Sequence, residues 1–432
     1  MAAGLGFKTF TSGEVLTAAD TNGYLMQGIL VFASASARNA AITSPQEGQY
    51  CYLKDTNSTE YYDGAAWVSG VEGDISGVTA GTGITGGGTS GTVTVSFDQA
   101  NFGGGQFSAG KNAIINGDFY WNQRAFTSTT SNATFTFDRF NTNATDGTTT
   151  FTAQTFTLGS EALTGADSPN YLQIATTGQT LSTALSSIAQ KVEGVRTFAG
   201  QTVTMSFYAK ASAGTPNITA FAAQNFGSGG SSIVFTGSTK KAITTSWARY
   251  SFTIAVPSIS GKTVGTGDHI RFDVCVSAGT DRNAYTDSLG IQTGTFQVWG
   301  VQVEIGSTAT PFQTATGTLQ GELAACQRYF EQYDAASGQV FYSGYQQSST
   351  SPRISLSVVP KRTTPTISFT GTLRVIVAGG TDINVTTIDA IAYAANSNML
   401  GFRANIASGG TAGDACALYA SGAVSVLYSA EL

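Results

Sequence analysis

The stretch TVTMSF at residues 202–207 decides the fold, because apolar and polar residues alternate along it. Successive side chains of a β-strand point to opposite faces, so Val203, Met205 and Phe207 would share the face that packs on a core. The same alternation recurs at 134–137, 251–256, 269–276 and 301–305. Turns rich in Gly, Ser and Asn separate these segments, and the pattern predicts an antiparallel jelly-roll β-sandwich over residues 111–316.

The rest of the chain is also predicted to be mainly β, in three further regions. Residues 1–70 combine a short helix, capped by Thr17 with Asp20 three residues on, with a small aromatic β-meander. Residues 71–110 are dominated by Gly and Thr and predict a thin shaft or neck, which has too little apolar surface to form a core without partner chains. Residues 317–432 begin with a short helix and continue as a second, smaller β-sandwich.

An apolar stripe marks the helix that opens the last region. Leu319, Leu323, Cys326, Phe330 and Tyr333 follow one another at intervals of four, three, four and three residues, the spacing of a heptad repeat. A stripe of this length is too short to be a coiled coil by itself. Leu319, Leu323, Cys326 and Phe330 therefore either meet their copies at a trimer interface or pack on a sheet, and the sequence leaves both interpretations open.

The composition argues against several classes of function. Charged residues make up 11% of the 432 and the net charge is −6, so no basic face is expected for nucleic acid. No apolar run reaches the roughly 18 residues of a membrane span, and the start of the chain lacks the pattern of a signal peptide. Scattered cysteines and a single histidine argue against a zinc site or a Ser-His-Asp centre. These residues are Cys51, Cys275, Cys326, Cys416 and His269.

Several stretches resemble tail-fibre and tail-spike proteins of tailed bacteriophages. The segment NAIINGDFYWNQR, residues 112–124, resembles the opening of a carbohydrate-binding-like jelly roll in such fibres, and VWGVQVEIG, residues 298–306, resembles its ending. The other similar stretches lie in order at 10–26, 31–34, 61–67, 77–97, 137–140, 309–312, 322–330, 360–366 and 429–432.

The resemblance implies a homotrimer in the virion tail, made in the cytoplasm of the bacterial host. Its N-terminal part, residues 1–70, would dock on a phage baseplate or tail protein, and its distal domains would bind a glycan or receptor on the host cell surface. The chain departs from polysaccharide-cleaving spikes in showing no long β-helix repeat, so we expect a binding protein and not an enzyme. The alternatives are a tail spike that degrades polysaccharide and a purely structural collar or adaptor.

Three tryptophans of the predicted jelly roll are candidates for stacking on sugar rings, because the indole has an apolar body and a polar edge. Trp299 lies two and four residues before Val301 and Val303, so in a regular strand all three point to the same side, which favours packing of Trp299 in the core. Trp247 precedes a strand and is expected in the core or at its rim. Trp121 is therefore the candidate glycan-binding residue, with structural packing as its alternative.

Four charges gather at Asp118, Arg124, Asp138 and Arg139 in a chain otherwise poor in charge. Arginine matches carboxylates geometrically, so Asp–Arg pairing is the expected role. The alternative is a glycosidase-like pair of Asp118 and Asp138. A second hypothesis places a structural Ca²⁺ on Asp118 and Glu304, since carboxylate oxygens suit this ion. No other metal or cofactor is expected.

Two further groups are weighed against ordinary structural roles. His269 falls on the same side of its strand as Arg271, which predicts a surface or interface histidine and not a catalytic base. Tyr342, Tyr345 and Gln346 lie in a Ser- and Gly-rich stretch, and exposed tyrosines with polar neighbours suit receptor contact. Ordinary strand and loop residues are the alternative for these three.

Overall fold

The computed structural model describes residues 8–25, 29–70, 77–81, 84–89, 91–97, 110–157, 169–392 and 399–432. The chain divides into two compact units, Met1–Asp98 and Gln99–Leu432. Strands make up most of the regular structure in both units, so the mainly β prediction is confirmed. None of the described helices is long and apolar enough to cross a membrane.

The first unit begins with the predicted capped helix. α1 (Ala18–Asp20) continues into a π-helical turn, η1 (Thr21–Leu25). The Thr17 hydroxyl accepts a hydrogen bond from the backbone N–H of Asp20, and the Asp20 carboxylate accepts one from the backbone N–H of Thr17. This reciprocal pair satisfies two donors at the helix start. Apolar side chains around the helix are exposed within this chain, namely Val15, Leu16 and Leu25.

A small sheet follows and contains the predicted aromatic meander. Its strands are β1 (Leu30–Phe32), β2 (Tyr50–Leu53), β3 (Ser58–Tyr62) and β4 (Trp67–Ser69). Helix α2 (Ala35–Ala41) connects β1 to β2, which run parallel, whereas the other pairs are antiparallel. The core of this sheet consists of Phe32, Ile42, Cys51 and Leu53.

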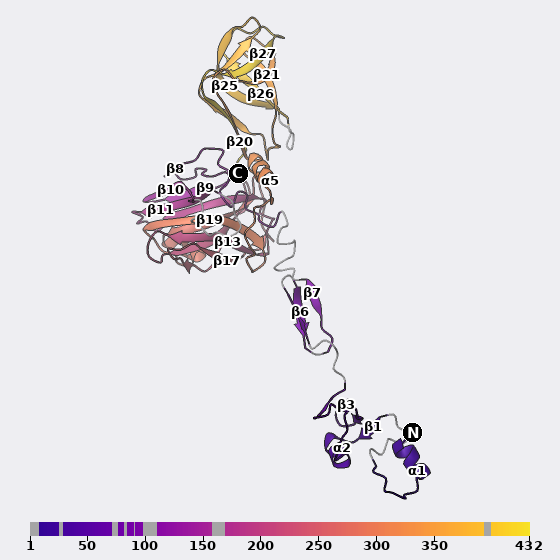
Figure 1. The fold of residues 1–432 in the computed structure, drawn as a ribbon. Helices are drawn as coiled ribbons and strands as arrows, with labels where there is room; N and C mark the ends of the chain where they lie inside the picture. Colours follow the sequence, from indigo (N-terminus) through magenta and orange to yellow (C-terminus); the bar gives the residue numbers. More distant parts are fainter. Residues whose placement is uncertain are drawn as a thin grey trace. The chain divides into compact units, whose positions relative to one another are not determined.

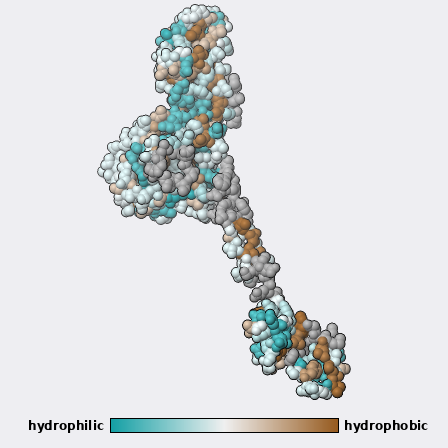
Figure 2. Space-filling model, in the orientation of Figure 1, coloured by the Kyte–Doolittle hydropathy of each residue, from teal (hydrophilic) through white to brown (hydrophobic). Residues whose placement is uncertain are grey.

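The Gly- and Thr-rich segment forms three short strands with no core of their own among the described residues. They are β5 (Val78–Thr79), β6 (Ile84–Gly88) and β7 (Val95–Phe97). Val78, Ile84 and Val95 are 37%, 44% and 47% exposed, and Figure 2 shows apolar surface along this segment. A sheet this thin cannot cover its apolar side chains by itself.

Two packed antiparallel sheets form the predicted sandwich in the second unit (Figure 1). One has the strand order β17-β13-β19-β11-β10-β8, and the other has β15-β14-β18-β12-β9 with β16 paired to β14. The strands are β8 (Ser128–Thr129), β9 (Asn141–Thr145), β10 (Thr148–Thr155), β11 (Asn170–Thr177), β12 (Leu185–Glu193), β13 (Thr202–Ala211), β14 (Asn217–Asn225), β15 (Val234–Gly237), β16 (Lys241–Ala242), β17 (Ala248–Ala255), β18 (His269–Ala278) and β19 (Gly294–Ile305). The short helices η2 (Thr280–Arg282) and α4 (Asn283–Thr286) connect β18 to β19.

The core between the sheets follows the alternation of the sequence. Val203, Met205 and Phe207 of β13 are buried together with Phe272 and Val274 of β18, in one cluster. These positions are the ones that the period of two assigns to the buried face. The prediction of a sandwich in this part of the chain is therefore confirmed.

Helix α5 (Leu319–Gln327) opens the last region but does not carry the whole apolar stripe. Phe330 begins strand β20 (Phe330–Ala335), which pairs with β28 (Val424–Ser429), so the prediction of one helical stripe through Tyr333 is wrong. Strand pairing takes over where the helix ends. Cys326 and Phe330 are buried within this chain, Leu323 is half-buried and Leu319 is 48% exposed. Packing inside the chain therefore accounts for Cys326 and Phe330, and they are not available for a trimer interface.

The last region closes into a barrel where a sandwich was expected. Its order is β21-β22-β26-β25-β24-β27, and β27 pairs back to β21. The remaining strands, β20, β28 and β23, form a separate three-stranded sheet. Alternation along a strand is common to barrels and sandwiches, so it cannot distinguish them. The bounds are β21 (Val340–Gln346), β22 (Pro352–Ser357), β23 (Thr366–Thr370), β24 (Leu373–Val377), β25 (Asp382–Ala392), β26 (Met399–Ile406) and β27 (Ala415–Ala420).

Candidate functional site

The outward side of the sheet β17-β13-β19-β11-β10-β8 holds a concentration of aromatic and polar side chains, and we name it the aromatic face. The strands of this sheet bury alternate residues in the sandwich core, so the intervening residues point outward. The register aligns the outward residues in rows that cross the strands. One row consists of Thr152, Gln173, Gln297 and Lys210.

The neighbouring row is aromatic. Tyr208 of β13 lies opposite Trp299 of β19, with 5.4 Å between the ring centroids. Trp247 precedes β17 and Phe156 follows β10, and their rings are 5.7 Å apart. The Trp247 ring also lies 5.5 Å from that of Tyr171 on β11. Because β13 and β19 separate β17 from β11 in the sheet, these side chains reach across the face.

A glycine bulge turns Trp299 toward this face. The register between β13 and β19 shifts by one residue next to Gly300, whose φ of +65° is a conformation that favours glycine. Trp299 therefore points outward with Tyr208, whereas Val303 pairs with Met205 in the core. The parity prediction for the face of Trp299 is wrong. Its predicted packing role is confirmed, because surrounding rings leave it only 1% exposed.

Several polar atoms of this face are buried and have no hydrogen-bond partner within the described part of the chain. They are the indole Nε1 of Trp247 and of Trp299, the Nε of Arg249 and the Oε1 of Gln297. Buried polar atoms are almost always paired in folded proteins, so each exception asks for an explanation. Buried polar atoms without a partner also occur elsewhere in the described residues, among them the indole Nε1 of Trp121 and the side-chain amide of Gln346.

A shallow hollow lies on the same face, next to the row of amides. Threonine dominates its lining, which consists of Thr148, Thr150, Ala175, Thr176, Thr177, Thr293, Gly294 and Thr295. Each threonine hydroxyl can donate one hydrogen bond and accept others. Rings, amides and hydroxyls thus follow one another across the face, and this is the set of groups that suits a ligand with apolar faces and many hydroxyls.

Two half-buried cations, Lys210 and Arg249, belong to the aromatic face. Lys210 and Arg249 lie over aromatic rings, at 5.1 and 5.9 Å from the ring centroids. Glu304 is the one carboxylate among the described outward residues of these strands, and it is 1% exposed. It accepts hydrogen bonds from the backbone and hydroxyl of Thr310, and the Lys111 ammonium lies 3.5 Å away. Burial lowers the pKa of Arg249.

Trp121, the glycan candidate from the sequence, has local contacts. Its ring packs edge-on against Tyr120 at 5.1 Å, and its backbone N–H donates to the Asn116 side chain at 2.8 Å. It is half-buried, and its indole N–H has no partner among the described residues. These contacts fit the packing alternative, and a glycan contact at Trp121 stays a prediction.

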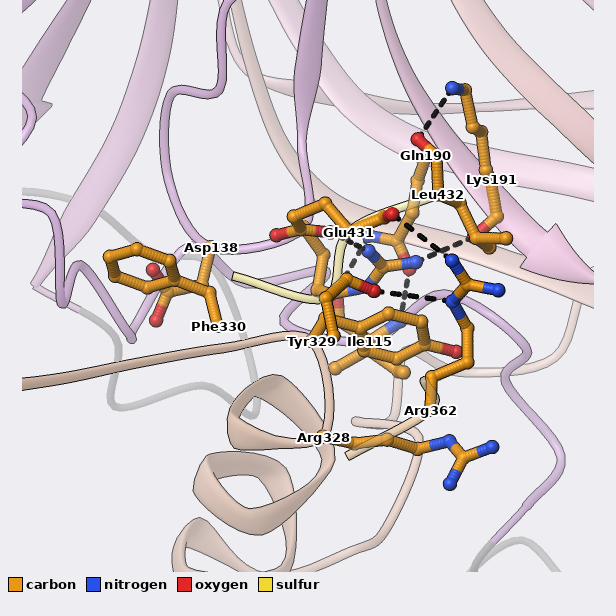
Figure 3. A network of polar contacts seen from close by, with 12 residues as sticks. Ile115, Asp138, Gln190, Lys191, Arg328, Tyr329, Phe330, Arg362, Glu431 and Leu432 are labelled. Atoms are coloured by element: carbon orange, nitrogen blue, oxygen red, sulfur yellow. Dashed lines mark hydrogen bonds and ion pairs between the residues drawn. The ribbon is translucent and has the colours of Figure 1, made fainter. Parts of the chain in front are cut away.

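The predicted Asp–Arg pairing is confirmed for Arg124 and Asp138, and the network extends to Glu431 near the end of the chain. Figure 3 shows Asp138, Tyr329, Phe330 and Glu431 of this network. Arg124 lies 3.4 Å from the Asp138 carboxylate and 2.9 Å from that of Glu431, which also pairs with Arg139. The Arg124 guanidinium lies over the Phe330 ring, 3.6 Å from its centroid. We name these residues, together with Tyr329, the junction cluster, because they join the sandwich to the start of β20.

The junction cluster is tied to strand β12 as well. Arg139 lies over the Tyr329 ring at 3.3 Å, and the Tyr329 hydroxyl donates to Glu193 at 2.6 Å. Arg328 donates to the same carboxylate at 3.0 and 3.1 Å. Although burial opposes it, these hydrogen bonds hold the pKa of Glu193 below its ordinary value. The Lys191 ammonium donates to the backbone of Leu432 at 2.6 Å.

A tight turn contains two residues of the junction cluster, Asp138 and Arg139. The strand predicted over 134–137 is wrong, because this segment leads directly into a reversal of the chain. The backbone N–H of Phe140 donates to the Phe137 carbonyl at 3.0 Å, and Arg139 adopts a φ of +74°. Asp138 and Arg139 occupy the centre of this turn. Their side chains therefore reach the junction cluster from one short segment.

The catalytic and calcium hypotheses both depend on Asp118. Burial, with a contribution from the charge of Glu322, raises the pKa of Asp118 to about 6. Asp138 is engaged by Arg124, and Glu304 is engaged as described above. No group of three or more His, Cys, Asp or Glu side chains that could hold a metal occurs within the residues that the structure describes. The calcium hypothesis stays untested.

The residues predicted for receptor contact on β21 do not form one surface. Tyr345 is 54% exposed and Tyr342 is half-buried against the barrel core, so receptor contact stays a prediction for both, whereas Gln346 is fully buried and the expectation is wrong for it. Neighbouring residues of a strand point to opposite sides, which separates Tyr345 from the other two. His269 is 8% exposed, with its Nδ1 3.0 Å from the Gly267 carbonyl, so the prediction of a surface histidine is also wrong. Burial lowers its pKa.

Sequence analysis misses most of the aromatic face. Four of its residues lie at positions that alternate with the buried ones along their strands, and the sequence says nothing more about them. They are Tyr171, Gln173, Tyr208 and Gln297. Their importance comes from the register of β11, β19 and β13, which brings together residues more than a hundred positions apart. The alternation along a strand assigns each side chain to one face of the sheet, but it does not say which strands are neighbours.

Comparison with solved structures finds matches of low sequence identity, with TM-scores below 0.3. The CBM22-2 xylan-binding domain from Paenibacillus barcinonensis Xyn10C is 17% identical, with 39% of this chain and 92% of that chain covered and a TM-score of 0.27. A putative sugar-binding protein from Bacteroides thetaiotaomicron is 13% identical, with 45% and 100% covered and a TM-score of 0.29. The enzymatically active domain of tailspike protein 4 of bacteriophage CBA120 is 13% identical, with 45% and 22% covered and a TM-score of 0.26. No family model and no curated protein matches the sequence.

Proposed function

We propose that the aromatic face binds a glycan chain without cleaving it. The observation that carries this proposal is the group of tilted and edge-on rings, with Tyr171 and Trp247, beside the row of amides that includes Gln297. A sugar offers apolar ring faces for stacking and hydroxyls that complete hydrogen bonds. The threonine hollow next to the amide row would receive a further sugar unit of the same chain.

Binding suits this face better than hydrolysis. Glycosidases generally need two carboxyl groups, roughly 5–9.5 Å apart, on either side of the scissile bond. The described outward residues of these strands offer Glu304 alone, and its oxygens are occupied by Thr310 and Lys111. We therefore assign the face to recognition.

We further propose that the chain is a homotrimeric phage tail fibre that attaches the virion to a glycan or receptor on the host cell. The sequence resemblance supports this assignment, with residues 1–70 docking on a baseplate or tail protein. Exposed apolar side chains support it as well, at Leu16 near the start and at Ile84 and Val95 in the neck, because their burial requires other chains. Three copies would present three binding faces, and the avidity would exceed the affinity of each.

The central test is glycan binding by the full chain. A glycan array identifies a ligand, and calorimetry with that ligand compares variants. Trp247→Ala removes a ring of the face and should weaken binding about tenfold or more, which corresponds to about 1.4 kcal/mol. Gln297→Ala should weaken it less, since one hydrogen-bonding group is lost. Tyr345→Ala is the control, because it removes an exposed ring from the barrel.

The outcomes separate the candidate sites and activities. Unchanged binding in Trp247→Ala with lost binding in Tyr345→Ala would move the site to the barrel. Release of reducing sugar from the ligand would establish the enzymatic alternative. Light scattering should give three times the protomer mass for the full chain, and the double variant Ile84→Asp with Val95→Asp should lower that mass. A monomeric wild-type chain would contradict the fibre assignment.

A further inference from the structure

A second hollow lies at one end of the sandwich, where the chain crosses between the two sheets, and we name it the loop hollow. Three segments enclose it: residues 180–182 between β11 and β12, residues 278–280 at the end of β18, and residues 290–291 before β19. Its volume of about 290 Å³ is close to the lower end of the range for small-ligand sites. The binding face described above does not include it.

Hydrogen bonds and close packing fix the segments around the loop hollow. The Asp146 carboxylate accepts hydrogen bonds from the backbone N–H groups of Thr180 and Leu181, at 2.5 and 2.7 Å. At Gly279 the neighbouring segment approaches so closely that an added Cβ would collide with the Ser182 carbonyl oxygen. The hollow is therefore formed without a ligand, and a ligand that enters it does not have to order these segments.

The lining of the loop hollow combines apolar side chains with hydroxyls. Leu181 and Ile291 are 55% and 40% exposed, and both line this hollow. A single exposed leucine is ordinary, whereas two large aliphatic side chains that line one hollow offer a place for an apolar group. Thr180 and Thr280 are exposed at the same hollow and can donate and accept hydrogen bonds. This lining suits a small apolar group carried by a ligand that is otherwise rich in hydroxyls.

The loop hollow lies next to the threonine hollow of the aromatic face. Thr177 lines the threonine hollow, and Thr180, three residues on, lines the loop hollow. In the second segment, Thr293 lines the threonine hollow and Ile291 lines the loop hollow. Residues two apart are separated by at most about 7 Å, even in a fully extended chain. A glycan in the threonine hollow therefore has its neighbouring sugar unit within reach of the loop hollow.

We propose that the loop hollow is a further subsite for the glycan and selects a sugar that carries a methyl group. This inference rests on the proposed glycan-binding function and names a feature of its ligand. The methyl group packs against Leu181 and Ile291, and hydroxyls of the same sugar bond to Thr180 and Thr280. The methyl group belongs either to a 6-deoxyhexose or to the N-acetyl group of an amino sugar. Both are small apolar groups on a polar ring, so burial of either favours binding.

The experiment measures binding of the full chain to two matched pairs of probes by calorimetry. The first pair is an L-rhamnose tetrasaccharide and the L-mannose tetrasaccharide of the same linkage, which carries a hydroxyl on the carbon that is a methyl group in rhamnose. The second pair is the N-acetylglucosamine tetrasaccharide of chitin and cellotetraose, which has a hydroxyl in place of the acetamido group. We expect the methyl-bearing member of at least one pair to bind about four times more tightly, because burial of one methyl group contributes about this factor. The pair that shows the preference identifies the source of the methyl group.

The variants attribute the preference to the loop hollow. The double variant Leu181→Asn with Ile291→Thr replaces both apolar side chains by polar ones and should remove most of the preference, while the affinity for the methyl-free probe changes less than about twofold. Ile233→Thr is the matched control, because Ile233 is 46% exposed just before β15, outside the hollow. Trp247→Ala should weaken both members of a pair alike, because it acts at the rings of the aromatic face. Should the double variant fail to fold, Leu181→Asn alone tests the same effect with a smaller expected loss.

The failures are distinguishable. Equal binding within both pairs, or binding of array glycans but of neither methyl-bearing probe, would overturn the methyl selectivity and leave glycan binding in place. A preference that the double variant leaves intact, or that Ile233→Thr reduces as much, would also overturn it, since the loop hollow would not be its source. A folded chain that binds none of the probes, and no glycan on an array, would overturn the proposed function itself.

Discussion

The junction cluster and the aromatic face use the same kinds of side chain in opposite ways. Each places arginines over aromatic rings: Arg124 covers Phe330 at 3.6 Å in the junction, and Arg249 lies 5.9 Å from Tyr208 on the face. In the junction, carboxylates complete the arrangement, since Glu431 meets both Arg124 and Arg139. On the face, no carboxylate of the described residues pairs with Arg249.

This difference teaches how to separate a structural network from a binding surface. A buried network is stable when its members satisfy one another, because a charge left without a partner costs several kcal/mol. In the junction cluster, the Nε of Arg139 is the buried atom that lacks a partner among the described residues, whereas on the aromatic face the indole N–H groups of both Trp247 and Trp299 lack one. Residue type alone does not distinguish the two, because the distinction lies in the partners.

The largest effect is expected from breaking the junction cluster. Arg139→Ala removes a side chain that is 2% exposed and leaves the Glu431 carboxylate, 7% exposed, with one partner fewer. Breaking a buried ion pair from one side costs about 3–5 kcal/mol in free energy of unfolding. Urea unfolding of the full chain, followed by tryptophan fluorescence, measures this loss.

The matched control for Arg139→Ala is Arg374→Ala on the barrel. Arg374 and Asp382 lie 3.4 Å apart, and their side chains are 32% and 37% exposed, so their ion pair is worth less than about 1 kcal/mol. The comparison also has a functional side: Arg139→Ala should keep the glycan affinity of the molecules that remain folded. Equal stability losses in the two variants would mean that the junction cluster is no more stabilising than a surface ion pair.

A smaller effect, dependent on pH, is expected from Asp118 beside the junction. Its pKa of about 6 lies above the ordinary value of 3.8, so its protonated form stabilises the fold below about pH 4 and this contribution is lost as the pH rises through 6. At pH 7 the carboxylate is ionised in a buried place, at a cost of up to about 3 kcal/mol. Asp118→Asn removes that cost.

The measurement compares the free energies of unfolding of wild type and Asp118→Asn at pH 4 and pH 7. The variant should gain stability relative to wild type between these two values, and the difference at pH 4 should be small. Acidic groups that do not interact with Asp118 titrate equally in both proteins, so their contributions cancel in the difference. A stability difference that is the same at both pH values would show that Asp118 is not held in its neutral form by the fold.

The sequence predicts local features of this protein well and assembled ones poorly. The alternation at 202–207 places Val203, Met205 and Phe207 in the core, and the Thr17 cap forms as expected. Both follow from neighbours along the chain. The charge group at Asp118–Arg139 was also visible, but its partner Glu431 lies about three hundred residues away, and no local pattern indicates it.

The errors have a common physical cause. Parity places Trp299 in the core only if β19 is regular, and a single bulge at Gly300 inverts the assignment. The stripe from Leu319 suggests a longer helix because the pairing of Phe330 with Ser429 is invisible in the sequence. In both cases, a contact between segments distant in the sequence changes the structure that the local spacing of apolar residues predicts. The aromatic face depends on such contacts throughout, which is why it was missed while the sandwich that carries it was predicted.

The smallest of these effects tests whether the bulge itself organises the aromatic face. Gly300→Ala forces a side chain into a φ of +65°, and the added Cβ would lie 3.1 Å from the Tyr208 ring and 3.6 Å from that of Phe312. The strain should cost about 1–2 kcal/mol in free energy of unfolding.

Gly261→Ala is the control, because Gly261 has a similar φ of +73° and an added Cβ would meet open space there. Both variants should lose comparable stability in urea unfolding, but only Gly300→Ala should also weaken glycan binding, because it displaces Tyr208 from the aromatic row. Equal affinities in the two variants would show that the face tolerates movement of its rings, and the contrast with the tightly paired junction cluster would then be one of rigidity as well as of partners.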